Sequence, residues 1–214
     1  MAERLYLFDT TLRDGQQTSG VDFSLADKIR IANALDSLGL DYIEGGYPGA
    51  NPTDSQFFAE DRKLASAVMT AFGMTKRAGR SADNDPGFME VLNAQAGAVC
   101  LVAKSWDYHV DVALGISNDE NLASIRDSVA AVGQHGREAM IDCEHFFDGY
   151  KANRDYALAC ATAALEAGAR WVVLCDTNGG TLPDEVFEIV SDVAQHIPGD
   201  HLGIHTHNDT ENAV

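Results

Sequence analysis

The stretch "LYLFDTTLRDGQQ" (residues 5–17) places a short apolar run directly before two acids, one base, two hydroxyls and two amides. A turn needs only one or two polar residues, so this concentration of polar side chains indicates a functional site at the end of a strand. The same order recurs along the chain, with polar or glycine-rich ends in "EGGYPGANP" (44–52), "KSWDYH" (104–109), "CEHFFDG" (143–149), "CDTNGG" (175–180) and "HTHND" (205–209).

Short apolar runs predict seven strands, at residues 5–8, 42–43, 67–71, 98–103, 139–143, 171–175 and 202–204. Amphipathic stretches between them predict helices at 24–39, 118–136, 153–169 and 182–199. In the first helix, Ser24 is the expected N-cap and Gly39 the expected C-cap. Its expected apolar face includes Leu38, which follows other apolar residues at the helical period. This alternation indicates parallel strands with right-handed crossovers, as in a doubly wound sheet or a barrel.

The positions of the polar residues favour the barrel. Nearly every predicted strand ends in them, and a (β/α)8 barrel gathers all its strand C-termini on one face, whereas a doubly wound sheet uses mainly its switch point. The predicted fold class is an α/β TIM (β/α)8 barrel with about seven βα units, forming one catalytic domain over residues 1–214. Closure of the barrel needs an eighth strand, so we expect the natural protein to continue past Val214.

The composition argues against several classes of protein. With 33 acids against 15 bases the formal charge is −18, which disfavours nucleic acid as a partner. The sequence has neither a long apolar run that predicts a membrane span nor the pattern of a signal peptide. The four cysteines have no CxxC spacing, and three of them lie in apolar runs, which predicts buried, reduced thiols. Together these features predict a cytoplasmic protein.

A pair of histidines suggests a metal site. His205 and His207 lie two residues apart at the end of the seventh predicted strand, so their side chains face the same way. An HxH pattern alone is weak evidence, because it is more often a pair of surface or hydrogen-bonded histidines than a pair of metal ligands. Asp14 follows the first strand, which in a closed barrel is separated from the seventh only by the eighth. The three residues together predict a catalytic divalent metal with open coordination positions.

Other strand ends carry further candidates. Arg13 either forms a local salt bridge or polarises a substrate carbonyl. Glu144 and Asp142 lie two residues apart, so both side chains are expected to point inward at the mouth of the barrel. Burying a carboxylate there costs free energy unless the group is paired or functional. Thr177 is either a turn residue or a hydroxyl donor to a substrate carboxylate. Glu44 precedes two glycines, which let a ligand approach the backbone or simply form the turn.

The motifs "DTTLRDGQQ", "IEGGYPGANPTD", "DCEHFFDGY", "CDTNGG" and "HTHND" together resemble the metal-dependent acyl-CoA carboligase family. That family includes the 2-isopropylmalate, homocitrate and citramalate synthases and the 3-hydroxy-3-methylglutaryl-CoA lyases. The resemblance covers nearly the whole chain and implies a TIM barrel in which Asp14, His205 and His207 hold a divalent metal (Mg, Mn or Zn). The stretches "EGGYPGANPTDSQFF" and "EHFFDGYKAN" are most similar to one branch of the citramalate synthases.

The resemblance also implies roles at the substrates. Arg13 would polarise the keto group of a 2-oxo acid. Glu144 would assist in enolising the methyl group of acetyl-CoA, the co-substrate, or orient the groups that do so. These two are the expected catalytic residues. Thr177 would bind the carboxylate of the oxo acid, Gln17 would order the site, and Glu44 is a further expected substrate-binding residue.

The implied reaction is a Claisen-type condensation of acetyl-CoA with a 2-oxo acid, followed by hydrolysis of the thioester. The strand ends near Glu44 and Asp142 carry acids and no obvious Lys or Arg, which disfavours a 2-oxodicarboxylate. Pyruvate is the expected substrate, giving citramalate for isoleucine biosynthesis. Alternatives are 2-isopropylmalate synthesis from 2-oxoisovalerate for leucine biosynthesis, a lyase of the same family, a metal-dependent hydrolase and a non-catalytic fragment. We expect a homodimer without nucleic-acid or membrane partners.

Overall fold

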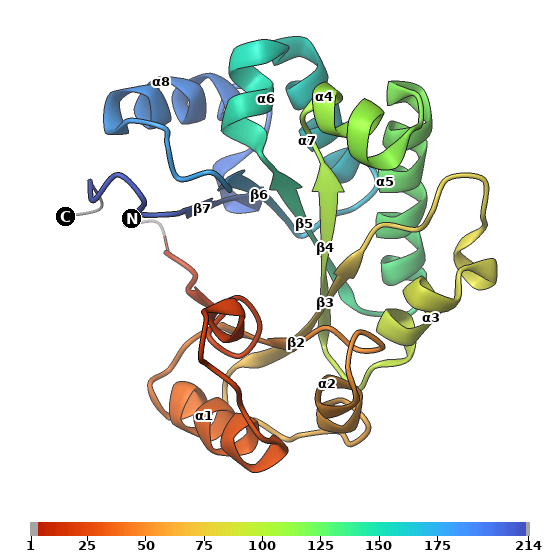
Figure 1. Cartoon of the computed structure of the whole chain (residues 1–214), viewed down its shortest axis with the longest axis vertical. Coiled ribbons are helices and arrows are strands. Elements are labelled where there is room, and N and C mark those ends of the chain that lie inside the picture. The colour runs from red at the N-terminus through yellow and green to blue at the C-terminus, as the bar shows by residue number, and fades with distance from the viewer. Residues whose placement is uncertain (1–3, 213–214) are drawn as a thin grey trace. The chain divides into compact units, whose positions relative to one another are not determined.

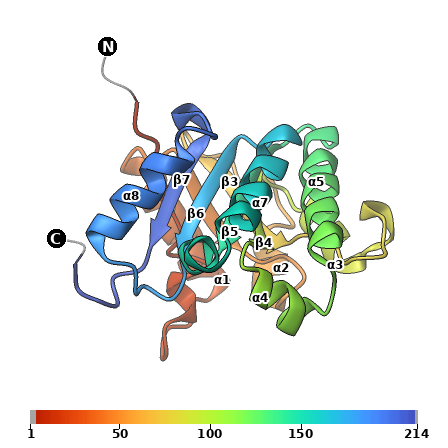
Figure 2. The same ribbon diagram turned by 90° about the horizontal axis from the view of Figure 1, so that it is seen from above.

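A computed structural model describes residues 4–212 of the chain. Seven strands lie in one sheet in chain order from β1 to β7, with helices between them (Figures 1 and 2). The strand pairs β1–β2, β2–β3, β5–β6 and β6–β7 are parallel. This arrangement confirms the predicted α/β barrel class, and the described residues supply seven of its strands. Two compact units make up the chain, Met1–Gly73 with Pro86–Cys100, and Met74–Asp85 with Leu101–Val214.

The first unit is built around β2 and its neighbours. Its elements are β1 (Phe8–Asp9), α1 (Leu25–Ser37), β2 (Tyr42–Gly46), α2 (Pro52–Phe57) and α3 (Pro86–Asn93), with most of β3 (Val68–Met74) and the start of β4 (Ala98–Lys104). The helices α1 and α2 pack against each other and against β2. A capping box starts α1, because Ser24 accepts from the main-chain N–H of Asp27, whose carboxylate accepts from Ser24.

The second unit contains the C-terminal part of the sheet. Its elements are α4 (Asp107–His109), a π-helix (Val110–Leu114), α5 (Asn118–Gln134), β5 (Glu138–Glu144), α6 (Phe146–Ala152), α7 (Arg154–Glu166), β6 (Trp171–Asp176), α8 (Pro183–Val193) and β7 (Leu202–Thr206). The helices α5 and α7 lie side by side and cover β5 and β6 (Figure 1). The sequence of α5 predicts one apolar face with Leu122, Ile125, Val129 and Val132. Ile125, Val129 and Val132 are buried as predicted, and Leu122 is half-buried.

All four cysteines are buried thiols, as the sequence predicts. Cys100 lies on β4, Cys143 on β5, Cys160 on α7 and Cys175 on β6. Burial raises the pKa of Cys143 well above its ordinary value and the pKa of Cys160 to about 12. The thiols of Cys143 and Cys160 therefore stay protonated in the folded protein. Among the described residues, no helix is both long and apolar enough to cross a membrane.

Several predicted boundaries differ from the structure. Only Phe8–Asp9 pair in β1, where the sequence predicts a strand over 5–8. Leu38 does not lie on the buried face of α1, because it is the C-cap residue and its side chain is 76% exposed. The short helices α2, α3, α4 and α6 are absent from the predicted elements, because each spans no more than about two turns, too short for a helical period to stand out.

Candidate active site

A tight turn presents Arg13 directly after β1. The main-chain N–H groups of Arg13, Asp14 and Gly15 all donate to the carbonyl oxygen of Thr10, at 3.1, 2.8 and 3.1 Å. Leu12, in the middle of this turn, is fully buried and anchors it to the core of the first unit. The sequence thus turns sharply at the strand end, which fixes the main chain from which the arginine side chain extends.

The guanidinium of Arg13 is held on three sides. Its Nε donates to Oε2 of Glu44 at 2.6 Å, and its Nη1 donates to Oδ1 of Asp14 at 2.9 Å. Its Cζ lies 4.0 Å from the centre of the Phe72 ring. A planar guanidinium can satisfy two carboxylates and stack on an aromatic face at once, which a lysine ammonium cannot do. The local salt bridge to Asp14 is therefore present, and Glu44 is buried against the same cation.

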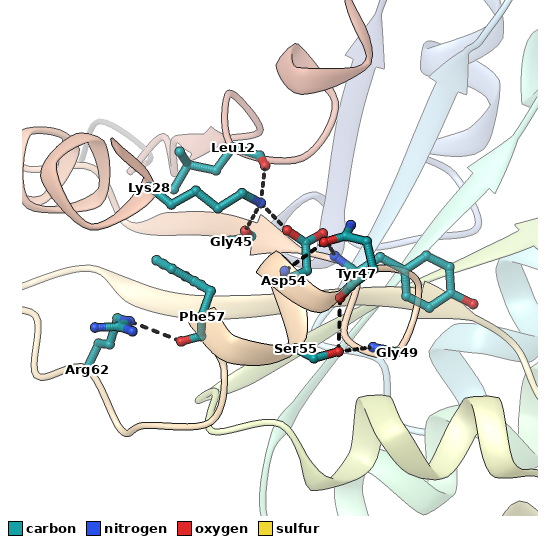
Figure 3. Close-up of polar contacts among 10 residues, drawn as sticks. Leu12, Lys28, Gly45, Tyr47, Gly49, Asp54, Ser55, Phe57 and Arg62 are labelled. Atoms are coloured by element: carbon teal, nitrogen blue, oxygen red, sulfur yellow. Dashed lines mark hydrogen bonds and ion pairs between the residues drawn. The ribbon is translucent and has the colours of Figure 1, made fainter. Parts of the chain in front are cut away.

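A buried ion pair that the sequence reading missed supports this turn (Figure 3). Lys28 on α1 is fully buried, and its Nζ donates to the carbonyl oxygens of Leu12 and Gly45 at 2.9 and 3.0 Å and to the carboxylate of Asp54 on α2. The other oxygen of Asp54 accepts from the main-chain N–H of Tyr47 at 2.8 Å. These contacts tie the β1 turn, the end of β2 and the start of α2 together.

A pocket of about 260 Å³ opens within the first unit beside this turn. Its lining includes the predicted site residues Arg13 and Gln17, together with Tyr47, Asn51 and Phe72. A cation, amides and aromatic rings around a small concavity suit a small polar ligand. Two of the predicted site residues of the first unit, Arg13 and Gln17, therefore border a cavity that could hold a small polar ligand.

In the second unit, the ends of β5, β6 and β7 lie next to one another. Cys175 of β6 pairs with His205 of β7 in the ladder. The hydroxyl of Thr177 accepts from the main-chain N–H of His145 at 2.9 Å, which links the end of β6 to the end of β5. His145 adopts a left-handed conformation, with φ of 54°, at the start of α6. The Thr177 hydroxyl keeps a proton that it can donate to a bound carboxylate.

The two histidines of the HxH motif have nearly parallel rings. The ring centres of His205 and His207 lie 5.0 Å apart with 20° between the planes. This confirms that the two imidazoles point the same way, as ligands of one cation must. Asp14 belongs to the first unit and the histidines to the second, so the shared metal site stays a prediction.

Glu144 has a cationic neighbour that the sequence reading overlooked. Lys104, the last residue of β4, forms an ion pair with Oε2 of Glu144, the last residue of β5. The expectation that the strand ends near Glu44 and Asp142 carry no Lys or Arg is therefore wrong, because Arg13 contacts Glu44 and Lys104 contacts Glu144. In the sequence, Lys104 is visible as a lysine that closes the apolar run of β4. Its partner Glu144 lies 40 residues further along the chain, so the ion pair leaves no local pattern.

The imidazole rings of His109 and His145 and the indole ring of Trp106 form a cluster beside Glu144. The ring centres of His109 and His145 lie 4.5 Å apart at 89°, and that of Trp106 lies 4.7 Å from that of His109. Burial, followed by the charges at His145 and Lys104, lowers the pKa of His109, so this ring is neutral near pH 7. His109, Glu144 and His145 could together hold a metal ion by their spacing, but the Lys104 ammonium at Glu144 opposes a second cation there.

A more deeply buried group lies near His205. Asp142 and Cys175 are buried, and with His205 each offers a potential ligand atom within 4.8 Å of the others. A carboxylate beside an imidazole commonly fixes the orientation of the ring in metal sites. Asp142, singled out in the sequence as a possible inward-facing acid, is therefore placed to support His205.

Comparison with known proteins identifies the family of this chain. The family model described as HMGL-like matches residues 4–214. An (R)-citramalate synthase of Aquifex aeolicus (strain VF5) is 50% identical to this chain, over 100% of the chain and 41% of that protein. A 2-isopropylmalate synthase of Pelotomaculum thermopropionicum is 31% identical, over 100% of the chain and 42% of that protein. The chain thus spans about two fifths of the length of the curated synthases that it matches.

Solved structures give the same fold. A hydroxymethylglutaryl-CoA lyase from Pseudomonas aeruginosa matches with a TM-score of 0.79 and 23% identity, over 98% of this chain and 70% of that one. An HMG-CoA lyase from Brucella melitensis matches with a TM-score of 0.81 and 19% identity, over 99% and 75%. The resemblance inferred from the strand-end motifs is confirmed, and the chain belongs to the HMGL-like family.

Proposed function

We propose that this chain carries the catalytic barrel domain of an acyltransferase that condenses acetyl-CoA with pyruvate to give citramalate. The observation that supports this choice is the higher identity to (R)-citramalate synthases than to 2-isopropylmalate synthases, in each case over nearly the whole chain. The substrates and the activity of the whole protein are inferred from these relatives together with the site residues.

Recognition of the 2-oxo acid falls to residues at the strand ends. Arg13 presents a guanidinium fixed by Glu44 and Phe72, suited to polarise the keto oxygen. A preorganised cation needs little rearrangement when negative charge develops on that oxygen. Thr177 donates its hydroxyl proton to the carboxylate, and Gln17, which borders the same pocket as Arg13, orders the site.

Asp14, His205 and His207 are the proposed holders of a divalent metal. The parallel imidazoles and a carboxylate form a donor set that fits Mg²⁺, Mn²⁺ or Zn²⁺, with Asp142 near His205 as a supporting acid. Bound there, the ion would supply Lewis acidity toward the oxo acid.

Glu144 is the proposed group for proton removal from the acetyl methyl. Its carboxylate accepts that proton, and the resulting carbanion equivalent forms a carbon–carbon bond to the keto carbon of pyruvate. The keto oxygen gains a proton and becomes a hydroxyl. Water then cleaves the thioester, which releases coenzyme A as a thiol and leaves the second carboxylate of citramalate.

We further propose that the protein acts in the cytoplasm as a homodimer. The buried thiols suit a reducing compartment, and the net charge of −18 disfavours nucleic acid as a partner. Sedimentation of the natural full-length protein tests the dimer.

Thiol release from acetyl-CoA by the full-length protein tests the proposed reaction, with pyruvate, 2-oxoisovalerate and 2-oxoglutarate supplied in turn. We expect the highest kcat/KM with pyruvate. A preference for 2-oxoisovalerate would assign the protein to 2-isopropylmalate synthesis. Release of acetyl-CoA from citramalyl- or hydroxymethylglutaryl-CoA without condensation would identify a lyase.

A further inference from the structure

The ends of β4 and β5 are joined by buried main-chain contacts. Ser105, which is fully buried, donates through its hydroxyl to the carbonyl oxygen of Glu144 at 2.7 Å, and its N–H donates to the same oxygen at 3.3 Å. Asn121 on α5, also buried, donates to the carbonyl oxygen of Lys104 and to the Tyr156 hydroxyl, both at 2.8 Å. The Lys104 and Glu144 side chains therefore extend from fixed main-chain positions.

The helix α6 packs closely against the chain directly after β4. A Cβ atom on Gly149 would lie 2.6 Å from the carbonyl oxygen of Ser105 and 2.9 Å from Cα of Trp106. The helix thus approaches the end of β4 as closely as main-chain atoms allow. The end of β4 therefore cannot shift toward α6, which helps to fix the main-chain position from which the Lys104 side chain extends.

The charges around Glu144 come from several elements. Lys104 faces it from β4, His109 from α4, and His145 and Asp148 from the start of α6, with 3.5 Å between Nδ1 of His145 and Oδ2 of Asp148. The pKa of the His109 ring is lowered by burial, so this ring is neutral near pH 7, and Asp148 adds a further carboxyl group to the cluster. Lys104 is therefore the permanent positive charge that contacts the Glu144 carboxylate.

We propose that Lys104 is a positioning residue for the condensation, an inference that rests on the proposed function. Its ammonium fixes one oxygen of Glu144, Oε2, so that the carboxylate is held in one orientation at the end of β5. The other oxygen, Oε1, is then the one that faces the acetyl methyl and takes its proton. A carboxylate on a flexible side chain would otherwise lose much of its efficiency as a base, because proton removal requires a defined approach.

A double-mutant cycle in the full-length protein tests this role. Lys104→Met is expected to lower kcat for coenzyme A release by about tenfold or more, with little change in the KM for pyruvate. Lys104→Arg keeps the charge and should retain most of the activity. Because Lys104 acts through Glu144, adding Lys104→Met to Glu144→Gln should cause no further loss of kcat.

The matched control is Lys151→Met, which removes a more exposed ion pair with Glu185 in the same unit. Equal kcat values for Lys104→Met and this control would overturn the inference, as would a full additional loss in the double variant. Thermal melts establish that each variant is folded, and Lys104→Gln replaces Lys104→Met if the latter is not. A wild-type protein that releases no coenzyme A with any of the three oxo acids would overturn the proposed function itself, and this inference with it.

Discussion

The ammonium of Lys28 donates to the carbonyl oxygen of Leu12, so a buried cation on α1 holds the residue directly before Arg13. The same ammonium donates to the carbonyl oxygen of Gly45, directly after Glu44. Arg13 and Glu44, which contact each other through Nε and Oε2, are thus both anchored through their chain neighbours to one buried charge. The geometry of the guanidinium depends on a residue that contacts no predicted substrate.

Replacing Lys28 with methionine should therefore destabilise the first unit strongly. The variant leaves the Asp54 carboxylate buried without its counter-charge, which typically costs about 3–5 kcal/mol in the free energy of unfolding. Urea denaturation of wild type and variant measures the difference. Lys63→Met removes an exposed ion pair with Asp61 and serves as control. A Lys28 variant as stable as this control would show that the buried pair does not support the fold.

Replacing Arg13 with lysine should reduce turnover more than stability. Lysine cannot bind Glu44 and Asp14 while stacking on Phe72, so the proposed electrophile loses its fixed position. We expect kcat in the full-length protein to fall on the order of 100-fold.

The control for Arg13→Lys is Arg62→Lys, because the Arg62 guanidinium also stacks on a phenyl ring, that of Phe57, at 4.8 Å. Wild-type turnover in Arg13→Lys, or an equal loss in the Arg62 variant, would assign Arg13 a structural role only. Circular dichroism spectra of both variants separate unfolding from loss of chemistry.

Metal content tests the proposed ligands. Asp14→Ala and His207→Ala are each expected to lower the bound divalent metal well below one equivalent, because three ligands reduced to two bind such ions weakly. Elemental analysis after dialysis measures the stoichiometry. His135→Ala is the control, since this ring contacts the carbonyl oxygen of Ala131 at the end of α5. Full metal content in both ligand variants would contradict the site.

Acid sensitivity is predicted at Asp36, near the end of α1. Its carboxylate accepts from the main-chain N–H groups of Ala65, Ser66 and Ala67 at 2.6, 2.9 and 2.8 Å, and these bonds lower its pKa from 3.8 to about 2. Because the folded pKa lies below the unfolded one, the stabilisation is complete above pH 3.8 and is lost as the pH falls toward 2.

Melting temperatures of wild type and Asp36→Asn across this range check the prediction. The wild type should melt higher above pH 3.8, and the gap should close as pH approaches 2. Asp155→Asn, at an exposed carboxylate, should show no such convergence. A gap for Asp36→Asn that stays constant down to pH 2 would contradict the assigned bonds.

Local patterns allowed much of the fold to be predicted. The Ser24 cap and the apolar face of α5 depend on neighbours three or four residues apart, so they can be identified in one sequence. The strand-end motifs placed Arg13 and Gln17 together for the same reason, because they follow a single strand. The helix α6 was missed, since it begins at a residue with positive φ and its buried Phe146 follows two polar strand-end residues.

The charged pairs could not be predicted. Lys28 looks like part of the polar face of α1, yet Asp54 lies 26 residues further along the chain and neutralises it in the core. Lys104 meets Glu144 only after β4 and β5 are aligned. Which lysine is buried depends on a partner brought close by the tertiary fold, and that partner has no signature in the neighbouring sequence.

The four buried cysteine thiols can be used as probes of local unfolding. A thiol reacts only where the reagent reaches it, and all four side chains are buried, so an alkylating reagent labels them only when the surrounding segment separates. Cys100 lies in the first unit, whereas Cys143, Cys160 and Cys175 lie in the second. The order in which mass spectrometry finds them modified therefore records which unit loosens first, without any introduced label.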